Sequence, residues 1–260
     1  MPMTNRLLPL EGIENFRDFG GYGASDGRRM VQGRFWRSAH HGKATPADIS
    51  AIRALDLTTV VDLRRPRERE SEPSRRPDGF SGQIIQCDLG DRAEAPHVAF
   101  LRDTDLTPDS VDAFFMDYYA KAPFEPRHPI LFRGYFEALL AAEASVLIHC
   151  TAGKDRTGLL AALTHHVLGV HRDDAISDFL MTNSAARVEA RAPLVAQALA
   201  QSLGRVPSDT AVRLFLGVDG KYLDAALEAI ARQCGSLESY LAGLGVDAVA
   251  TGRLRDRYLA

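Results

Sequence analysis

The chain has few of the features that mark secreted or membrane proteins. Its 260 residues contain only three cysteines, Cys87, Cys150 and Cys234, an odd number that suits a reducing compartment rather than a disulfide framework. No apolar run approaches the length of a membrane span, because the stretch 159–170 is interrupted by a threonine and two histidines. The first fourteen residues lack a basic segment followed by an apolar one, the pattern of a secretory signal. We therefore expect a cytoplasmic protein, with export by a signal-independent route left open.

The chain also lacks an excess of charge, internal repeats and low-complexity segments. A formal net charge of −3 gives no reason to expect a nucleic acid partner. Apolar residues make up 45% and charged residues 25% of the composition, which is usual for a folded globular protein. Because no linker-like segment divides the chain, we expect one domain over residues 1–260, with a sizeable core. These features do not predict the oligomeric state.

One stretch, residues 146–158, holds the densest pattern of reactive and flexible residues. Its first three residues are β-formers that lead into His149 and Cys150, and a pattern rich in alanine and leucine follows Thr157. These features predict a strand, a tight loop and a helix, with a cysteine at the strand end and Arg156 six positions later. Gly153 allows the backbone to turn closely, so that the loop amides can point inward and bind an anion.

The same loop combines a nucleophile with an anion site. The helix that begins near Arg156 adds its unpaired N–H groups and the positive end of its dipole. A cysteine beside such an end, with Lys154 and Arg156 close by, is expected to ionise well below its free value and to react as a thiolate. The planar guanidinium of Arg156 can hold two oxygens of a phosphate. The pattern therefore predicts phosphoryl transfer onto Cys150, whereas a merely structural cysteine would leave His149 and Gly153 unexplained.

These residues resemble the cysteine-based phosphatases, whose pattern is His-Cys-x5-Arg-Ser/Thr. The longer form here, H-C-T-A-G-K-D-R-T-G, is similar to that of the atypical bacterial tyrosine phosphatases, the mycobacterial protein tyrosine phosphatase B family. Other segments resemble the same family, among them N-F-R-D-F-G-G-Y at 15–22, R-S-A at 37–39 and D-L-R at 62–64. The resemblance implies a phosphotyrosine phosphatase-like α/β fold. That fold would have a central, mostly parallel sheet flanked by helices, a helical C-terminal half and a possible helical lid at 171–205.

The expected mechanism gives each residue of the loop a role. Cys150 attacks phosphorus and water then hydrolyses the phosphocysteine, with no metal or other cofactor required. Arg156 and the loop amides stabilise the charge on the three equatorial oxygens. Thr157 is expected to donate its hydroxyl to the cysteine sulfur, and His149 to orient the loop by a hydrogen bond to the backbone. The expected phosphate-binding residues are Thr151, Ala152, Gly153, Lys154, Asp155 and Arg156.

The general acid that protonates the departing oxygen has three alternatives. The Trp-Pro-Asp loop of the larger animal-type enzymes is absent, because proline does not follow the only tryptophan, Trp36. In the family the loop aspartate is the proposed acid, and it corresponds to Asp155. Asp62 is the second choice, because it is expected at the carboxyl end of a parallel strand, where ligands collect and where Arg64 would also face an anion. Asp117 lies in a helical context and is expected to be a surface carboxylate.

Phosphorylated proteins are the expected partners, with phosphotyrosine as the first substrate and phosphoserine or phosphothreonine possible beside it. Lys154 adds a charge that dual-specificity loops usually lack, and the family is reported to accept lipids as well as peptides. Phosphoinositide head groups are therefore an alternative substrate. A non-catalytic module that binds phosphorylated ligands is a distant alternative, because Cys150, Asp155 and Arg156 are all present. The Gly-Lys-Asp-Arg-Thr continuation argues against a sulfur-transfer enzyme of the rhodanese type.

Periodicity and capping residues predict the elements before the cysteine. Thr45 and Pro46 mark the start of a helix, and β-branched residues predict a strand at 58–64. The charged segment 65–76 and the polar segment 90–109 are expected to be surface loops. Further strands are expected at 33–39 and 83–89, and helices at 111–120 and 130–142.

The two ends of the chain are expected to differ in structure. Apart from the resemblance, the N-terminal segment 15–39 is typical of a hairpin with solvated arginines. After Gly169 the pattern is helical throughout, and the proline at 193 predicts a break in a helix over 188–203. Further helices are expected at 208–216, 219–234, 236–244 and 247–258.

Overall fold

A five-stranded sheet organises the protein, for which a computed structural model describes residues 6–89, 95–204 and 206–260. The strands lie in the order β1 (Arg17–Asp18), β2 (Phe35–Ser38), β5 (Val146–His149), β3 (Thr59–Asp62) and β4 (Gln83–Ile85). Strand β1 is antiparallel to β2, and the other neighbours are parallel. The α/β class with a mostly parallel sheet, predicted from the sequence, is confirmed.

The register of the central strands brings their carboxyl ends together. His149 of β5 lies opposite Ser38 of β2 and opposite Asp62 of β3. Parallel strands that end in register create a crevice at one edge of the sheet, and the residue after each strand enters it. Cys150, the residue after β5, therefore lies at the centre of that edge.

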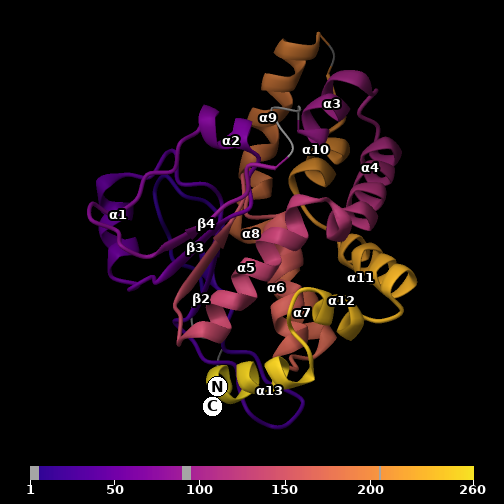
Figure 1. The fold of residues 1–260 in the computed structure, drawn as a ribbon. Coiled ribbons are helices and arrows are strands. Elements are labelled where there is room, and N and C mark those ends of the chain that lie inside the picture. The colour runs from indigo at the N-terminus through magenta and orange to yellow at the C-terminus, as the bar shows by residue number, and fades with distance from the viewer. Residues whose placement is uncertain (1–5, 90–94, 205) are drawn as a thin grey trace.

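Alternation along the strands divides the core into two layers. Val146 and Ile148 of β5 pack into the larger cluster, whereas Leu147 between them packs into the smaller one. The larger cluster includes α5 (Arg127–Ala141) and α6 (Asp155–Val167), and the smaller one includes α1 (Pro46–Arg53). Figure 1 shows α1 on one side of the sheet and α5 and α6 on the other. Helix α1 begins as predicted, with Thr45 as its N-cap and a capping box.

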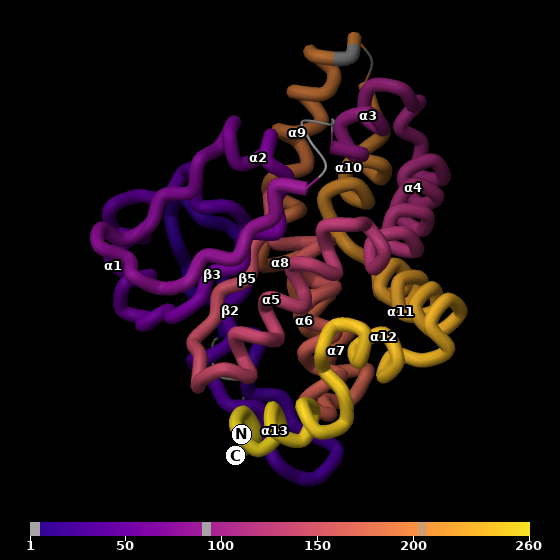
Figure 2. Tube along the Cα trace, viewed as in Figure 1, coloured from indigo at the N-terminus to yellow at the C-terminus, as the bar shows by residue number. Residues whose placement is uncertain are grey.

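Helices make up the C-terminal half, as predicted. In Figure 2, α9 (Val188–Leu203) and α10 (Asp209–Leu216) rise beside α3 (Pro96–Asp103), and the C-terminus lies below the sheet. The backbone of Ala260 pairs with that of Arg29, which fixes the C-terminus to the N-terminal segment. The remaining elements are α4 (Pro108–Lys121), η1 (Ala122–Phe124), α7 (Arg172–Leu180), α8 (Thr182–Ala185), α9 (Val188–Leu203), α10 (Asp209–Leu216), α11 (Gly220–Cys234), α12 (Leu237–Gly243) and α13 (Ala248–Tyr258).

Two segments predicted to be loops contain helices. Helix α2 (Pro66–Ser71) lies within the charged segment after β3, and α3 (Pro96–Asp103) lies within the polar segment after β4. Each begins with proline at its first position, where the missing N–H costs nothing and the fixed φ favours a helix. Residues 90–94 of the second segment lie outside the described residues. The expectation of plain surface loops was therefore wrong for both described helices.

One further expectation and one alternative interpretation need correction. Helix α9 continues through Pro193 instead of breaking there. Pro193 is exposed, so water can reach the carbonyl that loses its helical partner. Arg17 and Arg37 of the N-terminal segment are fully buried and paired with Asp178 of α7, so they are not solvated hairpin arginines.

Candidate active site

The loop between β5 and α6 has the predicted strand–loop–helix form. We call residues 150–156 the cradle loop. Cys150 follows the last residue of β5 and is 2% exposed, and α6 begins at Asp155. Gly153 has a φ of 65°, and a Cβ there would lie 2.4 Å from the backbone carbonyl of Ser38. Only glycine satisfies both the left-handed backbone and this close approach.

A cavity of about 200 Å³ opens over the cysteine. Cys150 and other residues of the cradle loop line it together with rings from α4 and α10. Among the described residues of the lid region predicted at 171–205, Ala186 and Arg191 contribute to this lining. The other lining residues are His97, Phe114, Phe115, Tyr118, Thr151, Ala152, Lys154, Asp155, Arg156, Phe215 and Leu216.

The guanidinium of Arg156 is engaged by a carboxylate from α2. Its Nη1 and Nη2 donate to Oε2 and Oε1 of Glu68, at 2.6 and 2.7 Å. The Thr151 hydroxyl also donates to Oε1 of Glu68. Burial disfavours the Glu68 charge, but its pairing with Arg156 and the hydrogen bond from Thr151 hold the pKa of Glu68 well below its usual range. A carboxylate therefore occupies the two guanidinium N–H groups that the sequence analysis assigned to phosphate.

Asp155 is held at the rim of the same cavity by two neighbours. Its Oδ1 accepts a hydrogen bond of 2.8 Å from the Tyr119 hydroxyl of α4 and lies 3.6 Å from Lys154 Nζ. Burial and the adjacent Asp155 charge raise the pKa of Tyr119 well above its usual value, so the hydroxyl stays a donor. Lys154 also donates to the Phe215 carbonyl at 2.8 Å and lies 4.1 Å from the centre of the Phe115 ring. The cradle loop is thus tied to α4 and α10.

Asp62 lies apart from the cavity in a buried cluster. Both of its oxygens accept hydrogen bonds from Arg64, at 2.9 and 2.7 Å, and Oδ2 lies 3.7 Å from His149 Nε2. Burial opposes the charge, yet His149 and Arg64 keep the pKa of Asp62 below its usual range. The pKa of His149 falls to about 4 because the ring is buried, and the ring stacks on His41. Asp62 and Arg64 are therefore partners of each other beneath the loop and do not line the cysteine cavity.

One predicted hydrogen bond does not form in this arrangement. The Thr157 hydroxyl is buried and has no hydrogen-bond partner among the described residues, the Cys150 sulfur included. The His149 ring is buried, stacks on His41 and lies beside the Asp62 carboxylate. Its orienting role toward the loop stays a prediction.

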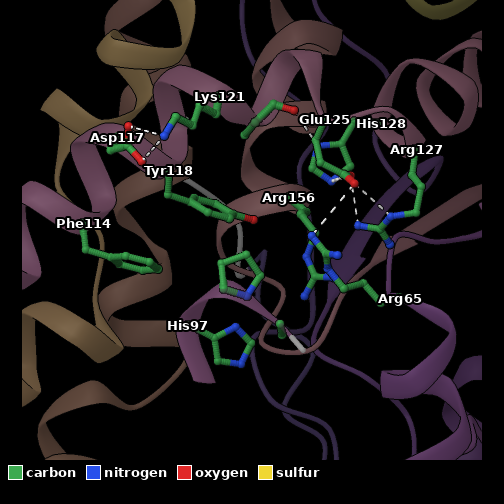
Figure 3. A pocket seen from close by; sticks show the side chains of 13 residues that line it. Arg65, His97, Phe114, Asp117, Tyr118, Lys121, Glu125, Arg127, His128 and Arg156 are labelled. Carbon is green, nitrogen blue, oxygen red and sulfur yellow. Dashed lines mark hydrogen bonds and ion pairs between the residues drawn. The ribbon is translucent and has the colours of Figure 1, made fainter. Parts of the chain in front are cut away.

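A second cavity of about 330 Å³ adjoins the first and shares Arg156 and Tyr118 with it. Figure 3 shows the Tyr118 hydroxyl directed toward Arg156, with Arg65, Arg127 and His128 gathered around Glu125. Asp117, the third alternative for the general acid, lies at the edge of this cavity, paired with Lys121 at 2.7 Å and largely exposed. Among the described residues, no group of three His, Cys, Asp or Glu side chains is arranged to hold a metal ion.

Comparisons with known proteins agree with this geometry. A family model described as "Tyrosine phosphatase family" matches residues 8–260. A protein of Cupriavidus necator named as a putative tyrosine-protein phosphatase is 34% identical over 254 residues, which cover 97% of this chain and 88% of that protein. The triple specificity protein phosphatase PtpB of Mycobacterium tuberculosis is 32% identical over 283 residues, covering 97% of this chain and 98% of PtpB. This chain belongs to the tyrosine phosphatase family.

Membership confirms the resemblance to the mycobacterial phosphatase B family and identifies the protein as a phosphatase, a hydrolase. A tyrosine-protein phosphatase of Nostoc commune is a more distant relative, 28% identical over 231 residues that cover 86% of this chain and 73% of the relative. Within the described residues, the phosphatase has no helix both long and apolar enough to cross a bilayer.

Sequence reasoning missed two residues of the phosphatase site, Glu68 and Tyr119. Glu68 lies in a charged segment that was interpreted as solvated loop. A helix start was visible, because proline opens α2 and glutamate follows at the third helical position, where its carboxylate accepts a hydrogen bond from the backbone N–H of Arg65. Tyr119 gave no comparable signal, since an aromatic residue at helical spacing is most often a core residue. Only the packing of α4 against the cradle loop reveals its bond to Asp155.

Proposed function

We propose that the phosphatase works through a phosphocysteine formed on Cys150. The observation that carries this proposal is the cavity lined by both ends of the cradle loop, Cys150 and Arg156. In the first step, the Cys150 thiolate forms a bond to phosphorus as the bond to the leaving oxygen breaks. In the second step, water attacks phosphorus, the phosphorus–sulfur bond breaks and the thiolate is regenerated with release of phosphate. Loop amides and Arg156 stabilise the charge on the equatorial oxygens in both steps.

Asp155 is the acid and base in this proposal. It lines the cysteine cavity, and its Oδ1 is fixed by Tyr119, which assigns Oδ2 to proton exchange. Asp155 protonates the leaving oxygen in the first step and takes the proton from water in the second. Asp62 is the weaker alternative because it is fully buried and both of its oxygens are paired with Arg64. We assign Asp62, Arg64 and His149 to supporting the sheet edge beneath the loop.

Substrate binding requires Arg156 to change partners. A phosphate dianion needs the Nη1 and Nη2 hydrogens of Arg156 that are bonded to Glu68. Glu68 must therefore either move away from the guanidinium or share these donors with the phosphate. The Thr157 hydroxyl, buried without a partner among the described residues, is available to the sulfur when it becomes the leaving group.

Phosphotyrosine is the substrate that the cavity favours. The rings of Phe114, Phe115, Tyr118 and Phe215 line the cavity together with the cradle loop, and a phenyl phosphate would stack among them. A phosphoinositide is the second candidate, because the adjoining cavity carries Arg65 and Lys121 and could receive a further phosphate. The relative PtpB is named a triple specificity phosphatase, which agrees with a site that accepts more than one substrate class.

Two substitutions test the mechanism. Cys150→Ser should abolish turnover of an aryl phosphate while leaving inorganic phosphate binding in place, because the loop amides and Arg156 remain. Arg156→Lys should lower the rate nearly as much as Arg156→Ala, because a point charge cannot replace a planar fork. Turnover by the Cys150→Ser protein would refute the phosphocysteine. Rates on phosphopeptides and on a phosphoinositide panel would then decide between the two substrate classes.

A further inference from the structure

The carbonyl groups of the cradle loop are held from outside by the N-terminal segment. The side chain of Asn15 donates to the carbonyls of Ala152 and Gly153 at 3.1 and 2.8 Å. Arg37 Nη2 donates to the carbonyls of Gly153 and Lys154, at 3.0 and 3.4 Å. The backbone N–H of His40 donates to the Thr151 carbonyl at 3.1 Å. Four consecutive carbonyls, Thr151 to Lys154, are therefore engaged by residues more than 100 positions earlier in the chain.

Peptide geometry turns this anchoring into an orientation of the amides. In a planar trans peptide, the N–H of the next residue points opposite to the carbonyl. Holding the carbonyls of residues 151–154 against the N-terminal segment therefore directs the N–H groups of residues 152–155 to the opposite side. That side is the cavity over Cys150, whose lining includes Ala152, Lys154 and Asp155.

A buried charge cluster fixes the two anchoring side chains. Asn15 has a φ of 59°, a conformation that asparagine tolerates, and its Oδ1 accepts a hydrogen bond from Arg17. Arg17 and Arg37 both pair with Asp178, at 3.3 and 2.6 Å, and each of the three is at most 1% exposed. One carboxylate thus balances two guanidiniums, and part of the remaining positive charge faces the loop carbonyls through Arg37.

We propose that Asn15 and Arg37 are positioning residues for phosphate binding. They hold the cradle carbonyls on the far side of the loop, so that the amides stay aimed at the phosphate before it arrives. This inference rests on the proposed function, since it requires the loop to bind phosphate. It differs from a purely structural role, in which these residues would only join the N-terminal segment to the core.

Two substitutions of Asn15 separate the donor from the backbone conformation. Asn15→Asp keeps the shape and the acceptor for Arg17 but replaces the donor with an oxygen that repels the loop carbonyls. Asn15→Gly keeps the left-handed backbone and removes the donor without adding repulsion. Arg37→Lys keeps a charge beside Asp178 but cannot join Asp178 and two carbonyls with one planar group. The matched control is Ile13→Ala, which opens the smaller core cluster two residues away.

The measurements are the inhibition constant of inorganic phosphate, kcat on an aryl phosphate, and the melting temperature, with all rates taken well below melting. Asn15→Asp should raise the phosphate inhibition constant and lower kcat, each by up to about a hundredfold, the lower end of the cost of losing an oxyanion donor, because the amides are misdirected rather than removed. Asn15→Gly and Arg37→Lys should shift both quantities in the same direction by smaller factors. Ile13→Ala should lower the melting temperature and leave the phosphate inhibition constant unchanged.

The outcomes separate the two proposals. An active wild-type protein whose Asn15 and Arg37 variants keep their phosphate inhibition constants would overturn the positioning role alone. The positioning role also fails if all four variants lose phosphate binding only in proportion to their melting temperatures. A wild-type protein that neither turns over nor binds phosphate would overturn the proposed function and, with it, this inference.

Discussion

The ion pair between Glu68 and Arg156 gives a quantitative test of the site. A phosphate dianion and the Glu68 carboxylate require the same guanidinium hydrogens, at Nη1 and Nη2. Glu68→Gln keeps one acceptor and replaces the other with an amide that faces the guanidinium. The variant therefore loses one charge-assisted hydrogen bond, about 1.5–3 kcal/mol. We predict that Glu68→Gln binds inorganic phosphate about 10-fold to 150-fold more tightly, because this free energy no longer opposes the ligand.

The assay is competitive inhibition of aryl phosphate hydrolysis by inorganic phosphate. Because the pKa of Glu68 is held below its usual range, the carboxylate stays charged through neutral and mildly acidic pH. The difference between wild type and variant should therefore persist from about pH 5 to 8, above the usual glutamate pKa of about 4.3. Glu70→Gln is the control, because Glu70 is exposed on the same short helix and its change removes the same charge.

A weaker affinity for phosphate in Glu68→Gln would refute this reasoning. It would mean that the Glu68 carboxylate chiefly orients Arg156. Removing the carboxylate would then disorder the guanidinium, and this loss would outweigh the gain from freeing its N–H groups. An equal gain in phosphate affinity in Glu70→Gln would also refute this reasoning. It would show that the affinity depends on the overall electrostatic potential around the site and not on the contact between Glu68 and Arg156.

Three further predictions follow from the same contacts. Asp155→Asn should slow the hydrolysis of alkyl phosphates far more than that of aryl phosphates, because only a poor leaving group needs a proton. Equal losses of rate on both substrates would mean that Asp155 only supports the loop, and Asp62 would become the acid to test. Burial opposes the charge of Asp62, Glu68 and Asp178, but their cationic partners hold each pKa below its usual range. Each therefore stabilises the fold above its usual pKa of about 4, and acid titration followed by circular dichroism should show stability falling as pH drops below that value. If the lid predicted at 171–205 exists, hydrogen exchange in α9 should slow on adding vanadate, while α7 in the same range, which carries the buried Asp178, stays protected throughout. Uniform protection of both helices with and without vanadate would assign them to the core.

The sequence predicted the parts of the site that depend on local patterning. The strand, loop and helix around Cys150 follow from β-formers, glycine and a run rich in alanine and leucine, and each of these acts within a few residues. The positive φ of Gly153 follows from the same turn. The mostly parallel sheet was expected from the resemblance to the family, and the alternation of strands with helices along this part of the chain agrees with it.

Contacts between distant segments could not be predicted in the same way. Nothing in the sequence around Arg156 indicates that Glu68, 88 positions earlier, would occupy its guanidinium. Burial of Arg17 and Arg37 contradicts their polarity, and it is explained only by Asp178, more than 140 positions later. Asp62 lies at the carboxyl end of β3, as predicted. Its pairing with Arg64, two residues later, agrees with its place as the second choice for the acid.

The strand order has a consequence for how the protein folds. Strands β2 and β3 are separated by a short stretch of sequence, yet they never pair, because β5 lies between them in the sheet. Until residues 146–149 leave the ribosome, β2 and β3 each expose an unpaired edge, and such edges template aggregation. Insertion of β5 closes a loop of more than 80 residues, which makes it a slow, non-local event. Because the same strand delivers Cys150, the nucleophile reaches its place only when the sheet is completed, so a truncated or misfolded chain carries no assembled site.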